Sequence, residues 1–116
     1  MLLTPATPYR RSRRTDPVGS IIGGGEHADY DIEGIGNDFI AKTMDMSLVD
    51  SVIKVTDSEA FAAVKELAKK EGILAGSSSG AALTAALKLA ARIDHGNIVT
   101  VFPDRGDRYL SKGLYN

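Results

Sequence analysis

Residues 51–72 contain a strand signal, a helix start and a helix stop in immediate succession. The segment 51–55 (Ser-Val-Ile-Lys-Val) is rich in β-branched residues and predicts a short strand. Thr56 and Glu59 then form a capping-box pattern, in which each side chain accepts a hydrogen bond from the backbone of the other. Apolar residues recur on one face of the following segment, and Gly72 is placed to end the helix in a left-handed conformation. A strand that leads directly into a capped amphipathic helix predicts an α/β fold.

The alternation of strand and helix continues toward the C-terminus. Residues 73–75 predict a second strand, and residues 76–80 predict a tight loop. Residues 81–91 are apolar on nearly every side, which predicts a buried helix. Residues 98–102 (Ile-Val-Thr-Val-Phe) predict a strand that is covered on both faces. The predicted order is β-α-β-α-β, a partial doubly wound parallel sheet in the α/β class, preceded by the loop-rich segment 16–50.

Residues 1–15 differ in composition from the rest of the chain. They contain four arginines and no acidic residue. Pro5 and Pro8 oppose a helix, which argues against an organelle-targeting peptide; a nucleic-acid-binding arm is the other functional reading. We predict that 1–15 form a basic head that is disordered or foreign to the fold, and that residues 16–116 form one domain.

The composition excludes several classes of protein. The chain of 116 residues has a net charge of -1, which calls for neither a nucleic acid nor an anionic membrane as partner. The absence of cysteine fits a reducing, cytoplasmic location. His27 and His95 have no metal-ligand spacing, so no metal site is predicted. No apolar run reaches the length of about 20 residues that a membrane span needs.

Two glycine-containing segments are candidates for chemistry. The segment 76–80 (Gly-Ser-Ser-Ser-Gly) follows a predicted strand and precedes a predicted helix, so it lies at the sheet edge where α/β proteins bind ligands. Its hydroxyls and free amides could hold an anion or a heterocycle, or could simply cap the helix. Gly34 and Gly36 could let a ligand approach the backbone, or could be plain turn residues.

Four segments taken together point to one family. They occur in the order Asp16–Ser20, Glu33–Phe39, Glu71–Ala81 and Phe102–Ser111. Their order and spacing resemble the last third of the catalytic domain in the cysteine synthase and cystathionine β-synthase family. Members of that family hold pyridoxal 5'-phosphate (PLP), eliminate the substituent of serine or O-acetylserine and add a thiol, in cysteine and transsulfuration metabolism.

The resemblance implies roles for individual residues. Ser78 matches the serine that hydrogen-bonds the pyridine nitrogen of PLP, and Ser79 and Gly80 would shape the same wall. Gly34 matches the glycine that passes beside the cofactor. Gly36 and Asn37 would border the pocket for the amino-acid substrate, although Asn37 departs from the tyrosine or small residue that family members carry.

The resemblance also implies that catalytic parts are missing from these 116 residues. The family's Schiff-base lysine segment and its phosphate-binding loop have no counterpart here, so we assign no catalytic residue. We therefore expect a lyase or transferase fragment that is inactive alone and that forms a homo-oligomer or associates with a missing half. The alternatives are a non-catalytic module that docks onto an intact homologue, and a general phosphate-binding half-domain.

Overall fold

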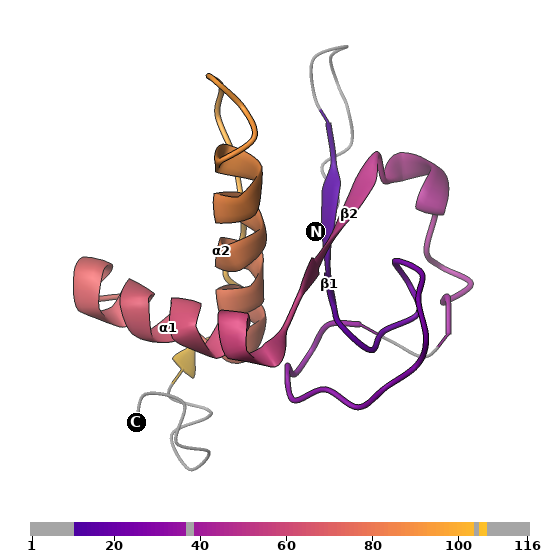
Figure 1. Cartoon of the computed structure of the whole chain (residues 1–116), viewed down its shortest axis with the longest axis horizontal. Coiled ribbons are helices and arrows are strands. Elements are labelled where there is room, and N and C mark those ends of the chain that lie inside the picture. The colour runs from indigo at the N-terminus through magenta and orange to yellow at the C-terminus, as the bar shows by residue number, and fades with distance from the viewer. Residues whose placement is uncertain (1–10, 37–38, 104, 107–116) are drawn as a thin grey trace.

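Two parallel strands form the sheet of this protein, which is a small α/β fold (Figure 1). The computed structural model describes residues 11–36, 39–103 and 105–106. Strand β1 (Arg13–Pro17) pairs with β2 (Ser51–Val55) in a register that runs from Arg13 opposite Ser51 to Pro17 opposite Val55. The connection between the strands holds one short 3-10 helix, η1 (Met46–Leu48).

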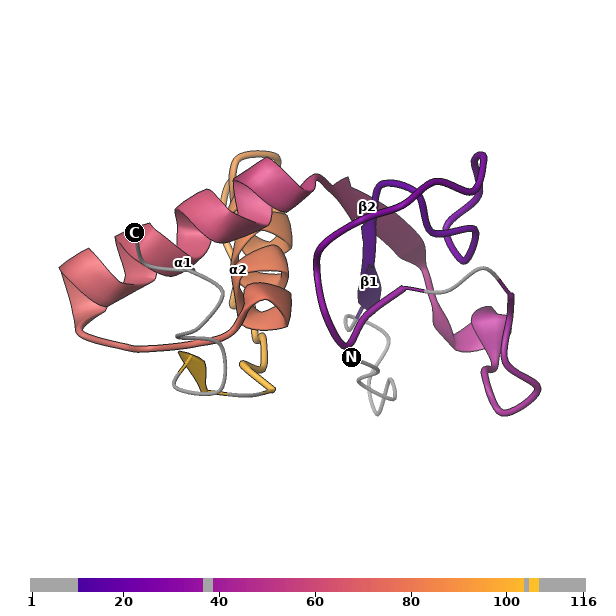
Figure 2. The same ribbon diagram turned by 90° about the horizontal axis from the view of Figure 1, so that it is seen from below.

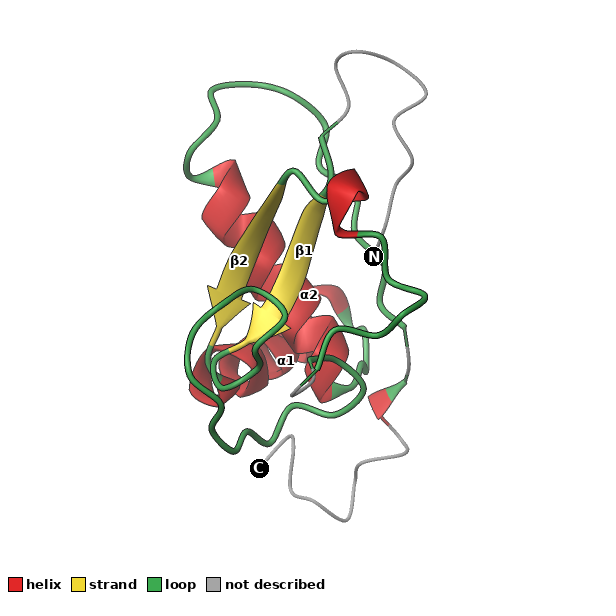
Figure 3. Cartoon of the chain, turned by 90° about the vertical axis from the view of Figure 1, so that its right-hand side faces the viewer, coloured by secondary structure: helices red, strands yellow, loops and turns green. Residues whose placement is uncertain are grey.

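Two helices lie on one side of these strands, as Figures 1 and 2 both show. They are α1 (Asp57–Glu71) and α2 (Ser77–Ala90). Figure 3 shows the long connection after β1 passing over the opposite side of the strands. The core between strands and helices is small and is made of Ile32, Ile53, Val55, Ala60, Ala81 and Ala85, with Tyr30, Ile35 and Leu89 packed against it.

The helix signals around residues 56–72 are confirmed. The Thr56 hydroxyl accepts a hydrogen bond from the Glu59 backbone N–H at 3.2 Å, and the Glu59 carboxylate accepts one from the Thr56 N–H at 2.8 Å. Gly72 ends α1 with φ +68°, the left-handed conformation that glycine adopts without strain. The capping box therefore fixes the point at which the chain leaves β2 and enters α1.

Helix α2 begins earlier than the sequence predicted. The expected loop 76–80 and helix 81–91 are replaced by a helix that starts at Ser77 and ends at Ala90. The serines therefore form the first turn of the helix, where the backbone N–H groups have no partner within the helix itself. Starting there also places Gly80 against α1, and the Thr84 hydroxyl, one turn further on, donates to the carbonyl oxygens of Gly80 at 2.9 Å and Glu59 at 3.2 Å.

The predicted strands at 73–75 and 98–102 are not formed in the described part of the chain. In the first segment only Ala75 pairs, in an isolated antiparallel bridge with Arg105. In the second, Val99 and Val101 are 63% and 51% exposed. A strand needs a neighbour for its N–H and C=O groups, and the sheet of β1 and β2 does not extend to either segment. The β-α-β-α-β order is therefore reduced to two paired strands and two helices.

The predicted boundary near residues 15 and 16 falls inside strand β1. Arg13, Arg14 and Thr15, which we assigned to a basic head that is disordered or foreign to the fold, pair with β2. Residues 1–10 lie outside the described part of the chain. An arginine-rich composition did not prevent pairing, because side chains alternate between the two faces of a strand and long cations can extend to solvent.

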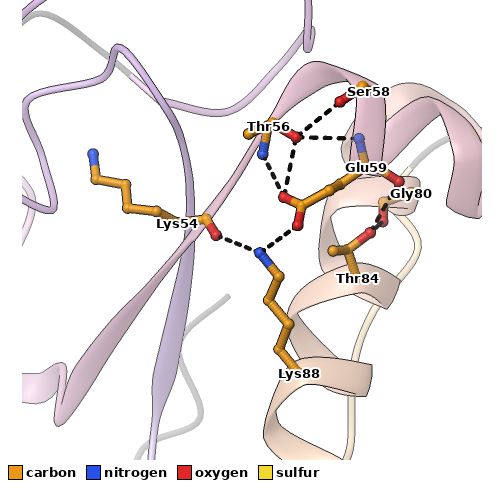
Figure 4. Close-up of polar contacts among 7 residues, drawn as sticks. All are labelled: Lys54, Thr56, Ser58, Glu59, Gly80, Thr84 and Lys88. Carbon is orange, nitrogen blue, oxygen red and sulfur yellow. Dashed lines mark hydrogen bonds and ion pairs between the residues drawn. The ribbon is translucent and has the colours of Figure 1, made fainter.

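Lys88 ties together three elements (Figure 4). From α2 its ammonium donates to the carbonyl oxygen of Lys54 in β2 at 3.1 Å and lies 2.8 Å from the carboxylate of Glu59 in α1. Lys88, with a further contribution from the Thr56 backbone N–H, holds the pKa of the Glu59 carboxyl below its usual value. The negative charge on Glu59 therefore supports both the helix cap and the packing of α2.

The lowered pKa predicts a stability change in acid. A carboxyl whose pKa is lower in the folded chain stabilises the fold above its unfolded pKa of about 4.3, and the contribution disappears as the pH falls through the folded value. We expect Glu59→Gln to be less stable than wild type at about pH 6, and the gap to narrow toward about pH 3. Urea unfolding at a series of pH values measures this, and a gap that does not change with pH would contradict it.

A second ion pair lies on the other side of the sheet. The Asp16 side chain in β1 is fully buried, and its Oδ2 atom is 2.6 Å from the ammonium of Lys54 in β2. Lys54 also donates to the carbonyl oxygen of Ser20 at 2.6 Å, and the backbone N–H of Gly23 donates to Asp16 Oδ2 at 2.9 Å. The pair thereby joins the two strands and holds the loop that follows β1.

Candidate functional site

The loop that carries Gly34 is attached to the first turns of both helices. The carboxylate of Asp57 in α1 accepts hydrogen bonds from the backbone N–H groups of Asp31 at 2.8 Å and Ile32 at 3.3 Å. The hydroxyl of Ser77 in α2 accepts one from the Glu33 N–H at 3.1 Å. Figure 1 shows this loop turning below the strands toward the junction of β2 and α1. Segments 44 residues apart, around Glu33 and around Ser77, therefore lie side by side.

Gly34 and Gly36 both have a left-handed backbone, with φ +81° and +80°. Among the described residues there is open space beside Gly34, because a Cβ atom built there would meet no heavy atom within 4 Å other than those of its chain neighbours. At Gly36 a Cβ atom would lie 2.5 Å from Pro17 Cγ and 2.8 Å from Tyr30 Oη. Gly34 thus leaves room for a ligand beside the turn. Gly36 lets the turn pack closely against the end of β1. Asn37, the other predicted pocket residue, lies outside the described residues.

Ser78 and Ser79 lie in the first turn of α2 and are buried. Within the described residues no hydrogen bond involves the Ser78 hydroxyl, although this residue is only 4% exposed. A hydroxyl without a partner among the described residues can bond a ligand, either as donor or as acceptor. Ser78 therefore suits the binding of a polar group of a ligand, and its neighbour Ser77 brings the Gly34 turn to the same helix end.

Gly80 serves the packing of the two helices. A Cβ atom at this position would overlap the carbonyl oxygen of Ala60 and would lie 2.6 Å from a methyl group of Val64. Both are residues of α1. A side chain at position 80 would therefore point into α1. Close packing of the two helices is enough to explain why glycine is present, and no ligand is needed for that explanation. Its predicted place in the cofactor wall stays a prediction.

The site residues that the sequence did not reveal are Asp57 and Ser77. The capping-box pattern assigned roles to Thr56 and Glu59, and Asp57 between them read as an ordinary acid of the first helical turn. Its bonds to Asp31 and Ile32 span 26 and 25 residues of sequence, which no local pattern encodes. The one available signal was an acid at the first helical position that the cap does not use.

Metal and membrane sites have no support in the described part of the chain. No group of three histidine, cysteine or acidic side chains gathers there. None of the helices described has the length and hydropathy to cross a bilayer.

The comparisons with known proteins show the family of this chain. The sequence model of the family described as "Pyridoxal-phosphate dependent enzyme" matches residues 6–104. The chain belongs to this family. The match begins within the basic segment 1–15 and includes Gly34 and Ser78. The open space beside Gly34 and the hydroxyl of Ser78 are compatible with the heterocyclic cofactor that gives the family of pyridoxal-phosphate dependent enzymes its name.

Curated relatives of this family member are cysteine and cystathionine synthases. It is 57% identical over 114 residues to the O-acetylserine dependent cystathionine beta-synthase of Bacillus subtilis, covering 97% of this chain and 37% of the relative. It is 50% identical to a cysteine synthase of Helicobacter pylori, covering 93% of this chain and 36% of the relative. This member of the family thus spans about a third of the length of the curated relatives it matches.

Solved structures of the family have the same arrangement. The O-acetylserine dependent cystathionine beta-synthase from Helicobacter pylori matches with a TM-score of 0.81 and 47% identity, covering 91% of this chain and 35% of that one. O-ureido-L-serine synthase matches with a TM-score of 0.87 and 31% identity, covering 95% and 35%. This family member is therefore a homologue of a defined third of these enzymes in fold and in sequence.

Proposed function

We propose that this chain supplies the C-terminal, cofactor-facing part of a PLP-dependent enzyme that eliminates the substituent of serine or O-acetylserine and adds a thiol. The observation that carries the proposal is the hydrogen bond from the Glu33 N–H to Ser77 Oγ. It brings the Gly34 turn against the helix end that holds Ser78. The 57% identity with an O-acetylserine dependent cystathionine beta-synthase supports this class of reaction.

The proposed roles follow from the environment of each residue. When bound, PLP supplies an electron sink for the carbon atoms of the amino acid. The Ser78 hydroxyl is a neutral donor for the pyridine nitrogen, which leaves that nitrogen without a proton. Gly34 admits the cofactor and substrate beside the backbone, and Ser79 completes the wall at the helix start. Gly36 and Asn37 border the substrate pocket, and the close contact of Gly36 with Pro17 fixes the position of the turn relative to the end of β1.

Exposed apolar side chains support association with further polypeptide. Leu74 and Leu87 are 56% and 59% exposed, and Val99 and Val101 alternate outward on an extended segment whose neighbours Ile98 and Thr100 are half-buried. Exposed apolar side chains of this kind are suited to contact with another polypeptide. We propose that the chain is inactive alone and acts with polypeptide equivalent to the other two thirds of its relatives.

A second candidate function is a non-catalytic module that docks onto an intact homologue. The same exposed residues, Leu87, Val99 and Val101, favour it. The two candidates differ in what the complex contains, because only the first requires Ser78 to touch PLP. A phosphate-binding half-domain, the third possibility, would place an anion and not a ring on the first turn of α2.

The test is complementation. The chain is mixed with a polypeptide that carries the part of the Bacillus subtilis relative outside the match, and PLP is added. We expect a stable complex with visible absorption from the cofactor, and we expect Ser78→Ala to change that absorption. Ser58→Ala, a serine in the first turn of α1, is the matched control and should leave the spectrum unchanged.

Two results would overturn the proposal. Turnover of O-acetylserine by the purified chain alone would show that the 116 residues are a complete catalyst. A complex that binds PLP with the same spectrum in wild type and Ser78→Ala would remove the role of Ser78 and favour the docking module.

A further inference from the structure

Three consecutive backbone N–H groups before Gly34 are held by side chains from two different helices. Those of Asp31 and Ile32 donate to the two carboxylate oxygens of Asp57, and that of Glu33 donates to the hydroxyl of Ser77. Asp57 is the first residue of α1 and Ser77 is the first residue of α2. We call this set of three hydrogen bonds the amide clamp.

Both acceptors are available because neither is needed by its own helix. In α1, Thr56 and Glu59 complete the capping box, so both oxygens of Asp57 can accept from the loop. In α2, the capping residue Gly76 has no side chain, and no side-chain hydrogen bond caps that helix. Bonds from N–H groups to an ionised carboxylate are stronger than bonds between neutral groups, so Asp57 contributes the larger share of the clamp.

The amide clamp matters because the described residues give Gly34 little packing of its own. Apart from its two chain neighbours, no described residue has a heavy atom within 4 Å of the position where its Cβ would be, so its conformation depends on the residues on either side. After Gly34, Gly36 packs closely against Pro17 and Tyr30. Before Gly34, the clamp holds residues 31–33. Glycine has the largest conformational freedom of any residue, so a turn between two such glycines needs fixed ends.

We propose that Asp57 and Ser77 are positioning residues that preset the Gly34 turn. The contact of this turn with PLP rests on the function proposed above. Successive residues of a helix point about 100° apart, so Ser77 can hold the loop while Ser78 remains available to a ligand. Neighbouring serines thus have separate tasks, one toward the loop and one toward the cofactor.

The test uses the 116-residue chain without cofactor and follows its amides by NMR. In Asp57→Ala we expect hydrogen exchange at Asp31 and Ile32, the two amides that lose their acceptor, to speed up by about tenfold or more, as expected for loss of a charge-assisted bond. The Gly34 and Gly36 signals should shift toward random-coil positions, while exchange in β2 stays as in wild type. Asp57→Asn keeps one acceptor oxygen and should give an intermediate change.

Ser77 provides a second, independent variant. Ser77→Ala removes the acceptor for the Glu33 N–H and should loosen Glu33 and Gly34, whereas Ser77→Thr keeps a hydroxyl and should restore both. Glu66→Gln is the control for charge, because it removes an exposed carboxylate of α1 that pairs with Lys70 and takes no part in the helix cap or the clamp.

The outcomes separate this proposal from the proposed function. Unchanged exchange at Asp31 and Ile32 in Asp57→Ala would overturn the amide clamp. Faster exchange with unchanged Gly34 signals would overturn the positioning role and leave a purely structural contact. Both readings are made without PLP, so they do not depend on the cofactor spectra that judge the role of Ser78.

Discussion

Replacing Lys54 by methionine is expected to be among the most destabilising single changes in this chain. Methionine keeps most of the apolar stem but leaves the fully buried Asp16 carboxylate without its cation. The Asp16 carboxylate would then keep the hydrogen bond from the Gly23 backbone N–H. Its Oδ1 atom is already buried without a partner in the described residues. Breaking a buried pair costs about 3–5 kcal/mol, and because the Lys54 side chain is 30% exposed we expect about 2–3 kcal/mol.

The chain contains its own control for this experiment. Lys70 and Glu66 form an exposed pair at 3.1 Å within α1, with side chains 73% and 54% exposed. Lys70→Met should therefore change the free energy of unfolding by less than about 0.5 kcal/mol. Urea denaturation of both variants measures the difference. Equal effects would mean that the Asp16–Lys54 pair does not join the strands energetically.

The second large effect is expected at Gly80, where two principles predict opposite signs. Glycine to alanine inside a helix usually stabilises by about 1 kcal/mol. Here the added methyl would overlap the Ala60 carbonyl oxygen, which belongs to the backbone of α1 and cannot rotate away. We expect packing to win, with a net destabilisation of about 1–3 kcal/mol in Gly80→Ala.

A matched variant separates overlap from other effects of a methyl group. Gly24→Ala adds the same methyl in open space, although at a positive φ of 86°. It should cost about 1 kcal/mol from backbone strain alone. Thermal unfolding of both variants gives the comparison, and a Gly80→Ala protein as stable as wild type would show that α1 and α2 can separate without penalty.

Local patterns predicted the parts of this fold that local interactions determine. Thr56, Glu59 and Gly72 act within a few residues of their partners, so strand β2 and helix α1 could be located from sequence. Strand β1 could not, because its residues read as a basic tail until Ser51–Val55 lies beside them. The prediction of a strand at 98–102 was wrong for a different reason. The composition of this segment is typical of a strand, but the described residues provide no neighbouring strand for it.

The candidate site divides in the same way. Resemblance to a family pointed to Gly34 and Ser78, and the fold places their segments side by side. It did not reveal that Gly80 is required by α1, nor that Asp57 and Ser77 hold the loop. The contacts of Asp57 and Ser77 join residues 25 to 44 positions apart, and their partners are backbone N–H groups that carry no sequence signature.

The parallel pairing of β1 with β2 has a consequence for the order in which the fold assembles. Every pair in this register is 38 residues apart, as are Asp16 and Lys54, so the whole connection must close before the first ladder bond forms. Helix α1 needs only its own cap and can form early. We therefore expect strand β1 to dock after α1 has formed, and to be held on β2 by the ladder, by the Asp16–Lys54 pair and by the hydrogen bond from the Ser12 N–H to Asp50.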